Sequence, residues 1–342
     1  MRIAVVGATG LVGQRLIRYL LREPAFAGAE ILPFASERSA GGELTVEGRP
    51  FTVLSTADLS VHAPYEVAFT AVGDQLSRTL VPELREMSRV VIDKSRTFRL
   101  DPEVPLVVAG VNDHALREHR GLVANPNCST IELCHLLGPL RELSPTRVLV
   151  ATYQSVSGAG QQALVRFHRE LDQIAHARDL DEKVLSPEML AANLIPQIGH
   201  LEEEGYASEE EKLSEESKKI LSLPHLRVEA TAVRVPVFVG HAMAVTVEFA
   251  RPADPAEVER LLRASPHIRY FPQAGDALPS PLTAATHDQV EVGRLRPSRV
   301  FAGGVSLFAC ADNLGIGAAL NGVRIARALV REGQAVGGES DG

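Results

Sequence analysis

Short apolar runs alternate with helix-sized amphipathic segments over the first 125 residues of the chain. After the first run, Leu16, Leu20 and Leu21 recur at the spacing of a helix that buries one face. Strands that alternate with helices in this way form parallel sheets, so the pattern predicts a doubly wound, Rossmann-type α/β domain. The predicted strands are residues 3–6, 30–35, 67–72, 90–92 and 106–108, with 77–87 as one of the intervening helices.

The pattern changes after about residue 125. Longer segments rich in Val and Thr predict strands, and two of them flank Gly240-His241, which predicts antiparallel neighbours. A last apolar segment at helical spacing predicts a helix that returns to pack on the first domain. The strands are expected at 146–154, 227–239 and 242–250, and the helices at 164–176, 208–221 and 315–331. The second domain is therefore expected to be α+β.

Composition narrows the possible partners. The 342 residues are 45% hydrophobic, enough for a buried core, and carry a formal net charge of −8. No general basic field exists to attract a polyanion, so nucleic acid and anionic membrane surfaces are not expected partners. No apolar stretch approaches the roughly 18–20 residues that span a bilayer. The N-terminus shows no leader pattern, and three cysteines make a poor disulfide framework, so we expect a cytoplasmic, reduced protein.

Gly7, Gly10 and Gly13 lie between the first predicted strand and the first predicted helix. Glycines here permit a tight turn and the close approach of a pyrophosphate, which the N–H groups at the helix start can bind. The G-x-x-G-x-x-G spacing is weak by itself and also fits a purely structural turn. Its position directly after the first strand favours a dinucleotide site.

The residues after the second strand indicate which dinucleotide binds. An acid at this place favours NAD, whereas an arginine accommodates the 2′-phosphate of NADP. The sequence offers both, as Glu37 and Arg38. Because Ser36 and Ser39 add two hydroxyls beside a guanidinium that binds phosphate bidentately, we expect NADP.

Cys128 is the strongest candidate for a chemical role. It follows Asn125-Pro126-Asn127 and precedes an apolar helical pattern, which places the thiol at or near a helix N-terminus. The helix dipole there stabilises the thiolate and lowers the pKa of the thiol. The amide of Asn127 could help to bind an oxyanion. Cys134 and Cys310 are interpreted as small buried hydrophobes.

A thiolate nucleophile needs a partner for proton transfer. Among 11 histidines, His241 is the candidate, because it follows Gly240 in a predicted turn between two apolar strands, a rigid mounting. An isolated histidine in a loop is more often without a chemical role. No group of Cys and His residues has zinc-like spacing, so no metal is expected.

Taken together, four motifs resemble those of aspartate-semialdehyde dehydrogenases, and the resemblance covers nearly the whole chain. The Asn-Pro-Asn-Cys motif with a downstream Gly-His is the specific part, whereas the glycine turn is shared with many nucleotide-binding proteins. The motifs are Gly7–Gly13, Asn125–Thr130, Tyr153–Gly160 and Arg234–His241.

The resemblance implies a fold and an activity. It implies a dinucleotide-binding domain of residues 1–126 plus 314–333 and a catalytic and dimerisation domain of residues 127–313, in a homodimer. The implied reaction is the NADPH-dependent reduction of L-4-aspartyl phosphate to L-aspartate 4-semialdehyde, with release of phosphate, through a thioester on Cys128. This is a step of diaminopimelate, lysine, threonine and methionine biosynthesis.

The resemblance also assigns roles residue by residue. Cys128 is similar to the family nucleophile, His241 to its acid/base residue and Gln154 to the residue that orients the substrate. Arg99 and Lys212 are similar to its phosphate-binding residues, Glu209 to the residue that handles the substrate amine, and Arg234 to the carboxylate clamp. Taken alone, Glu209 would be assigned to a solvated acidic face, since its surroundings are rich in acids. The expected cofactor contacts are Gly7, Thr9, Gly10, Leu11, Val12, Gly13, Ser36, Arg38, Ser39, Ser157, Gly158 and Asn313.

The chain departs from the family pattern around this core. The loop Lys94–Arg99 carries two added positive charges, and Met243 replaces an acid near His241. Two alternatives therefore remain: a related reductase with another acyl substrate, such as an N-acetylglutamyl phosphate, and a non-catalytic nucleotide-binding homologue.

Overall fold

The computed structural model describes residues 1–177, 185–272 and 277–337. The chain forms two compact units, Met1–Asn127 with Ala318–Gly342, and Cys128–Gly317. No helix in the described ranges is long and apolar enough to cross a membrane.

The first unit is built on a six-stranded sheet in the order β5-β2-β1-β6-β7-β8, with every pair parallel. This order reverses at β1, as in a Rossmann fold, so the point between β1 and β6 is where such folds bind a ligand. The strands are β1 (Arg2–Val6), β2 (Glu30–Ala35), β5 (Leu54–Ser55), β6 (Tyr65–Thr70), β7 (Ser88–Asp93) and β8 (Leu122–Ala124), and a separate hairpin joins β3 (Glu43–Val46) and β4 (Arg49–Thr52).

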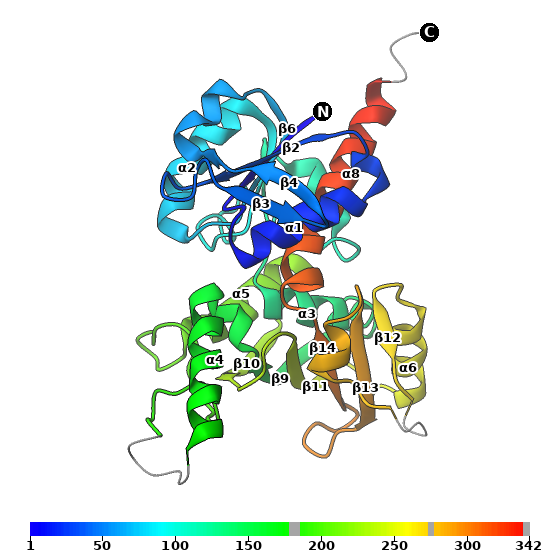
Figure 1. Ribbon diagram of the computed structural model, residues 1–342. Helices are drawn as coiled ribbons and strands as arrows, with labels where there is room; N and C mark the ends of the chain where they lie inside the picture. The colour runs from blue at the N-terminus through cyan, green and yellow to red at the C-terminus, as the bar shows by residue number, and fades with distance from the viewer. Residues whose placement is uncertain (178–184, 273–276, 338–342) are drawn as a thin grey trace. The chain divides into compact units, whose positions relative to one another are not determined.

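Helices cover this sheet because one face of each is apolar. Leu16 and Ile17 of α1 pack with Ile3, Val5 and the apolar side of α8 in one core. The ribbons of α1 and α8 lie next to each other in Figure 1. The final predicted helix therefore does pack on the first sheet, although it begins as a π-helical turn at Gly315–Ala319. The helices are α1 (Leu11–Arg22), α2 (Asp74–Met87) and α8 (Leu320–Gly337), with 3₁₀ turns at Pro24–Phe26, Thr56–Val61 and Asp113–Glu118.

One predicted strand of this unit is wrong. Residues 106–108 form no strand, and only Leu106 makes an isolated bridge, to Ala124. The side chain of Asn112 takes the place of a strand partner: its Oδ1 accepts from the Val108 N–H and its Nδ2 donates to the Leu106 carbonyl, both at 2.9 Å. These bonds satisfy the backbone groups on the edge away from β8, whereas on the side of β8 the pairing is limited to the Val107 N–H and the Pro105 carbonyl, which bond to Ala124.

The second unit contains a mixed six-stranded sheet in the order β10-β9-β11-β14-β13-β12. Residues alternate along β9, so that Val148, Val150 and Thr152 are buried while Leu149 and Tyr153 are exposed. Helices α3 and α5 pack on the sheet at β10, β13 and β14. The strands are β9 (Pro145–Gln154), β10 (Arg227–Arg234), β11 (His241–Phe249), β12 (Ile268–Tyr270), β13 (Val290–Pro297) and β14 (Val305–Ala311); the helices are α3 (Cys128–Leu137), α4 (Gln161–His176), α5 (Ser208–Leu221), α6 (Pro255–Ala264) and α7 (Pro281–Ala284), with 3₁₀ turns at Arg141–Leu143 and Val156–Ala159.

The predicted antiparallel pairing across Gly240-His241 is also wrong. β10 and β11 lie on opposite sides of β9, the first parallel to it and the second antiparallel. The segment between them passes around the end of β9, where the carbonyls of Val237 and Phe238 accept from Val156 and Ser157. These hydrogen bonds attach the connecting segment to the turn that follows β9. The chain therefore crosses the end of β9, and β10 and β11 pair with β9 on its two sides.

Candidate active site

Cys128 is the first residue of α3, as the sequence predicted. Residues 129–137 of this helix are buried, so packing on all sides holds the helix in place. Cys128 itself is half-buried. The positive end of the helix dipole therefore faces the thiol and favours its anionic form. A Cβ added to Gly317 would lie 3.3 Å from the Cys128 Cβ, so a larger residue there would crowd the nucleophile. Cys134 and Cys310 are fully buried, where desolvation raises the pKa of each thiol.

A chain of polar contacts joins Gln154, Glu209 and Lys212. The Gln154 Nε2 donates to one oxygen of Glu209 at 3.2 Å, and the Lys212 ammonium contacts the other oxygen at 2.9 Å. Gln154 ends β9, and the other two lie in the first turns of α5, where a carboxylate interacts favourably with the helix dipole. Glu209 is only 5% exposed, so it is a buried, paired carboxylate and not part of a solvated acidic face.

Arg234 brings a buried positive charge to the same place. It ends β10, and its Nη1 donates to the Ser155 carbonyl at 2.7 Å. Burial lowers the pKa of its guanidinium, while the charges of Cys128 and Glu209 act in the opposite direction. These interactions place Arg234 within electrostatic reach of both the thiol and the Glu209 carboxylate.

His241 was expected in the turn before a strand, but it is itself the first residue of the buried strand β11. Its Nδ1 accepts from the backbone N–H of Ser155 at 3.1 Å and lies 3.1 Å from the Ser155 hydroxyl. Burial, followed by the positive charge of Arg234, lowers the pKa of His241 to about 3, against the opposing effects of Glu209 and a backbone interaction with Gly240. The ring is therefore neutral, and since Nδ1 accepts a hydrogen bond, its proton lies on Nε2.

The Nε2–H of His241 is buried and makes no hydrogen bond within the described part of the chain. Gly158 lies beside it: a Cβ at that position would be 3.2 Å from Nε2 and 2.9 Å from the Arg234 Nη1. A side chain at position 158 would therefore crowd both polar groups, which glycine does not.

Asn313 and Ser155 hold this arrangement together. The Asn313 Oδ1 accepts from the Gly240 N–H at 2.9 Å and from the Ser157 hydroxyl at 3.1 Å. Asn313 and Ser157 were predicted as cofactor contacts, and their described bonds are to each other and to neighbouring protein groups. Ser155 was missed, although it stands inside a motif that the sequence singled out. The only available signal was its place beside Gln154, because its partner His241 is 86 residues away.

The glycine turn lies in the first unit. Gly7 has a φ of +85°, and a Cβ there would be 2.6 Å from the Ala71 carbonyl; a Cβ on Gly13 would be 2.2 Å from the Gly7 carbonyl. Gly10 is the N-cap of α1, with no side-chain cap and no acid in the first turn, an arrangement suited to a phosphate group. Thr9 is exposed, while Leu11 and Val12 are half-buried.

The other predicted site residues of this unit lie in the turn after β2, in the loop before Asp101 and at Asn127. Ser36, Glu37 and Arg38 are exposed in the turn after β2, and Ser39 is half-buried. Arg99 is 6% exposed, and its Nη2 donates to the Lys94 carbonyl at 2.6 Å. Asn127, also buried, closes the first segment of this unit. The structure thus gathers Cys128, Gln154, Glu209, Lys212, Arg234 and His241 in the second unit, and the glycine turn, Arg38, Arg99 and Asn127 belong to the first.

Comparison with known proteins matches both units to one family. Residues 2–119 match the model of the semialdehyde dehydrogenase NAD binding domain, and residues 137–316 match that of the semialdehyde dehydrogenase dimerisation domain. Aspartate-semialdehyde dehydrogenases from Aquifex aeolicus and Bacillus subtilis are 37% and 36% identical, over 97% and 96% of this chain and 98% and 97% of their own.

A solved structure gives the same result. The chain is similar to the crystal structure of aspartate semialdehyde dehydrogenase II from Vibrio cholerae, complexed with ASA, with a TM-score of 0.89 and 37% identity over 97% of this chain and 98% of that one. The first unit therefore carries the nicotinamide dinucleotide-binding domain of this family, and the chain belongs to the aspartate-semialdehyde dehydrogenase family.

Proposed function

We propose that the chain catalyses the NADPH-dependent reduction of L-4-aspartyl phosphate to L-aspartate 4-semialdehyde, with release of phosphate. The observation that carries this proposal is the polar cluster around Cys128 in the second unit. This cluster contains a nucleophile at a helix N-terminus, a buried guanidinium, the Glu209–Lys212 pair and a neutral His241. Such groups can bind a substrate that has an acyl group, an amine and two anionic groups.

The cofactor site proposed for NADP is the glycine turn with Arg38. The α1 N-terminus, which no side chain caps, would bind the pyrophosphate, and the exposed Arg38 with Ser36 and Ser39 would bind the 2′-phosphate. When bound, NADPH supplies the hydride that reduces the acyl group. Thr9, Leu11, Val12, Ser157, Gly158 and Asn313 remain proposed contacts.

The residues of the second unit would carry out the rest of the reaction. The Cys128 thiolate attacks the acyl carbon, phosphate leaves, and a thioester remains on Cys128, which divides one difficult step into two. Arg234 would bind the substrate carboxylate and Glu209 its amine, while Lys212 and Arg99 would bind the phosphate. Gln154 would orient the acyl group beside the thiol, and Asn127 would lie near the oxyanion.

His241 would act through its Nε2–H. A neutral imidazole at a pKa of about 3 is a hydrogen-bond donor to the substrate oxygen, where negative charge develops during attack and collapse. The imidazole is buried, and a hydrogen bond is electrostatically stronger in such a low-dielectric setting than in water. This role refines the expected acid/base function, because Nδ1 is already engaged by Ser155 and cannot take up a proton without losing that bond.

The deciding assay is the reverse reaction. Aspartate semialdehyde, phosphate and NADP are combined, and NADPH formation is followed, with NAD and N-acetylglutamate semialdehyde as comparisons. We expect a phosphate-dependent signal with aspartate semialdehyde and NADP, and its loss in Cys128→Ala with NADPH binding retained. A signal with the other aldehyde alone would indicate a different acyl substrate. Cofactor binding without turnover of either aldehyde would indicate a non-catalytic homologue.

We also propose that the chain works as a homodimer. The family model that matches residues 137–316 is a dimerisation domain. In this unit, Leu149 and Tyr153 leave an apolar surface on the side of β9 that faces away from its buried residues. A second copy of the chain is the proposed occupant of that surface.

A further inference from the structure

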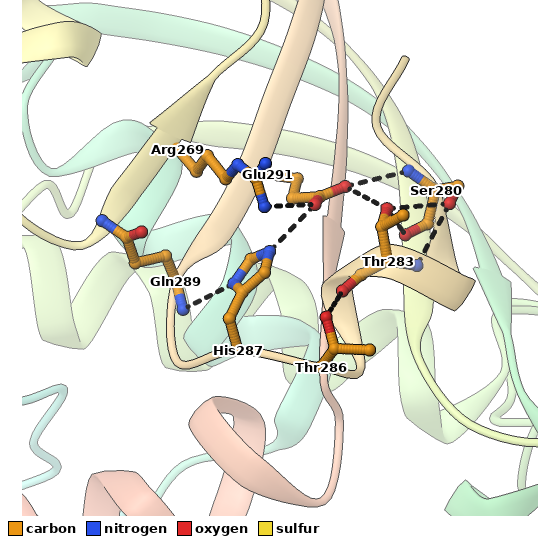
Figure 2. Close-up of polar contacts among 7 residues, drawn as sticks. All are labelled: Arg269, Ser280, Thr283, Thr286, His287, Gln289 and Glu291. Atoms are coloured by element: carbon orange, nitrogen blue, oxygen red, sulfur yellow. Dashed lines mark hydrogen bonds and ion pairs between the residues drawn. The ribbon is translucent and has the colours of Figure 1, made fainter. Parts of the chain in front are cut away.

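A buried carboxylate on β13 has no part in the chemistry described so far. Glu291 is 0% exposed, although it is charged, and burying a carboxylate costs several kcal/mol unless donors compensate for the lost water. Here the compensation is extensive. Its Oε2 accepts from the Ser280 N–H at 3.0 Å and the Thr283 hydroxyl at 2.8 Å, and its Oε1 contacts the His287 Nε2 at 2.9 Å (Figure 2).

Most of these donors come from one short segment. Ser280, Thr283 and His287 belong to α7 or its flanks, and Arg269 of β12 adds a more distant charge at 3.8 Å. The four-residue helix α7 is far too short to be stable by itself. Its position therefore depends on the Glu291 contacts, on the Ser280 cap, and on Ala284, which is buried against Ala242 and Cys310.

Pro281, the first residue of α7, fits tightly against Gly240. A Cβ built on Gly240 would lie 2.6 Å from the Pro281 carbonyl oxygen and 3.0 Å from the Pro281 Cα. Gly240 has a φ of +90°, which glycine adopts without strain, so the chain meets Pro281 in a conformation that suits no other residue. The backbone N–H of Gly240 is fixed to Asn313 at 2.9 Å.

His241 is the next residue after Gly240. The backbone that contacts Pro281 therefore also sets the orientation of the His241 imidazole. We propose that Glu291 is a positioning residue for His241: it holds α7, α7 holds Pro281 on Gly240, and Gly240 sets the start of β11. The proposal rests on the function proposed above, because it assigns His241 a role in that reaction. Glu291 acts through the backbone and touches no substrate.

The test compares Glu291→Gln, Thr283→Val and Gly240→Ala with the wild type. Glu291→Gln keeps the size of the side chain but loses its charge, and Thr283→Val removes one donor. Gly240→Ala disturbs the Pro281 contact from the other end and leaves every side chain of the Glu291 cluster unsubstituted. Glu259→Gln on α6, an exposed partner of Arg263, is the matched control and should behave as the wild type.

Two readouts are needed. The first is the reverse reaction, in which we expect kcat to fall about 10- to 100-fold for Glu291→Gln and Gly240→Ala, and less for Thr283→Val, with KM nearly unchanged, since small displacements of a catalytic group cost up to about 10²-fold. The second is the ¹⁵N NMR signature of the His241 ring, which should shift from a single Nε2–H tautomer towards a mixture. Combining Glu291→Gln with Gly240→Ala should cost little more than either change.

The outcomes separate the two proposals. Unchanged His241 ring signals in the variants, with or without a loss of rate, would overturn the positioning role. An inactive wild-type enzyme would instead overturn the proposed reaction, while the ring signals still report on Glu291. If Glu291→Gln does not fold, Thr283→Val carries the test of the Glu291 cluster, because it removes a donor to Glu291 and leaves the backbone at Gly240 unchanged.

Discussion

The neutral state of His241 makes a quantitative prediction. The pKa of this ring falls from 6.5 to about 3 in the folded chain, so the folded state resists protonation while the unfolded state does not. A depressed folded pKa contributes stability that is fully present above the unfolded pKa and is lost as the pH falls towards the folded pKa. The loss therefore begins near pH 6.5 and continues towards pH 3.

The magnitude follows from proton linkage. Each pH unit below the unfolded pKa costs 1.36 kcal/mol, so His241 should contribute a loss of about 2 kcal/mol in the free energy of unfolding at about pH 5 relative to about pH 7.5. Replacing His241 with Asn, whose side chain can still accept from Ser155, removes this contribution. On the same change of pH, the variant should lose about 2 kcal/mol less than the wild type.

Two measurements check this prediction. Denaturant unfolding of the wild type and His241→Asn at the two pH values gives the difference directly, and the other ten histidines cancel because both chains contain them. Since two units need not unfold together, NMR of ring-labelled protein provides an independent check. The His241 signals, assigned by their loss in His241→Asn, should show the Nε2–H tautomer and no titration between about pH 8 and pH 5. A His241 that titrates near pH 6.5 would refute both the pKa argument and the hydrogen-bond donor role.

Three further predictions concern single side chains. Gly158→Ala should lower kcat/KM at least about tenfold, because the new Cβ would crowd Arg234 and His241. Gly322→Ala is the control and should leave kcat/KM unchanged, since its Cβ would make only ordinary contacts. A Gly158→Ala enzyme with wild-type kcat/KM would contradict this geometry. Arg38→Ala should raise the KM for NADP about 10- to 100-fold, because a hydrogen bond to a charged group contributes about 1.5–3 kcal/mol to binding. The KM for NAD, which lacks the 2′-phosphate, should stay unchanged in initial-rate assays. Equal effects on both cofactors would place the 2′-phosphate elsewhere. Leu149→Asp should shift the chain towards monomers in sedimentation velocity, since it puts a charge on the proposed interface; an unchanged dimer would exclude that face.

The sequence predicted those features that depend on local pattern. Alternating strands and helices were enough to predict the parallel sheet, and the polar loop before an apolar helix was enough to place Cys128 at a helix start. Contacts between distant segments were not predictable in this way. The orientation of His241 by Ser155 and the position of β9 between β10 and β11 both depend on how the chain passes around the end of one strand.

Contacts outside the local pattern also explain why residues 106–108 were wrongly predicted as a strand and why the burial of Glu209 was not evident from its acid-rich surroundings. Apolar residues at strand spacing indicate burial, but here the pairing with β8 ends at one bridge and the Asn112 side chain bonds the outer backbone groups. An acid-rich helix indicates solvent exposure, yet Glu209 is buried because Gln154 and Lys212, on either side of it, compensate for its charge.

The single amide of Asn313 has a consequence for how this protein can diverge. One oxygen accepts from Gly240, Ser155 and Ser157, so it fixes both the strand that begins at His241 and the turn that carries Gly158. A substitution at any of these three partners changes the geometry that the others experience. Mutational paths through this part of the chain should therefore be strongly epistatic: single changes would be rejected, and functional variants would be reached only by coordinated replacement. Directed evolution towards a new acyl substrate should accordingly find its tolerated changes elsewhere first.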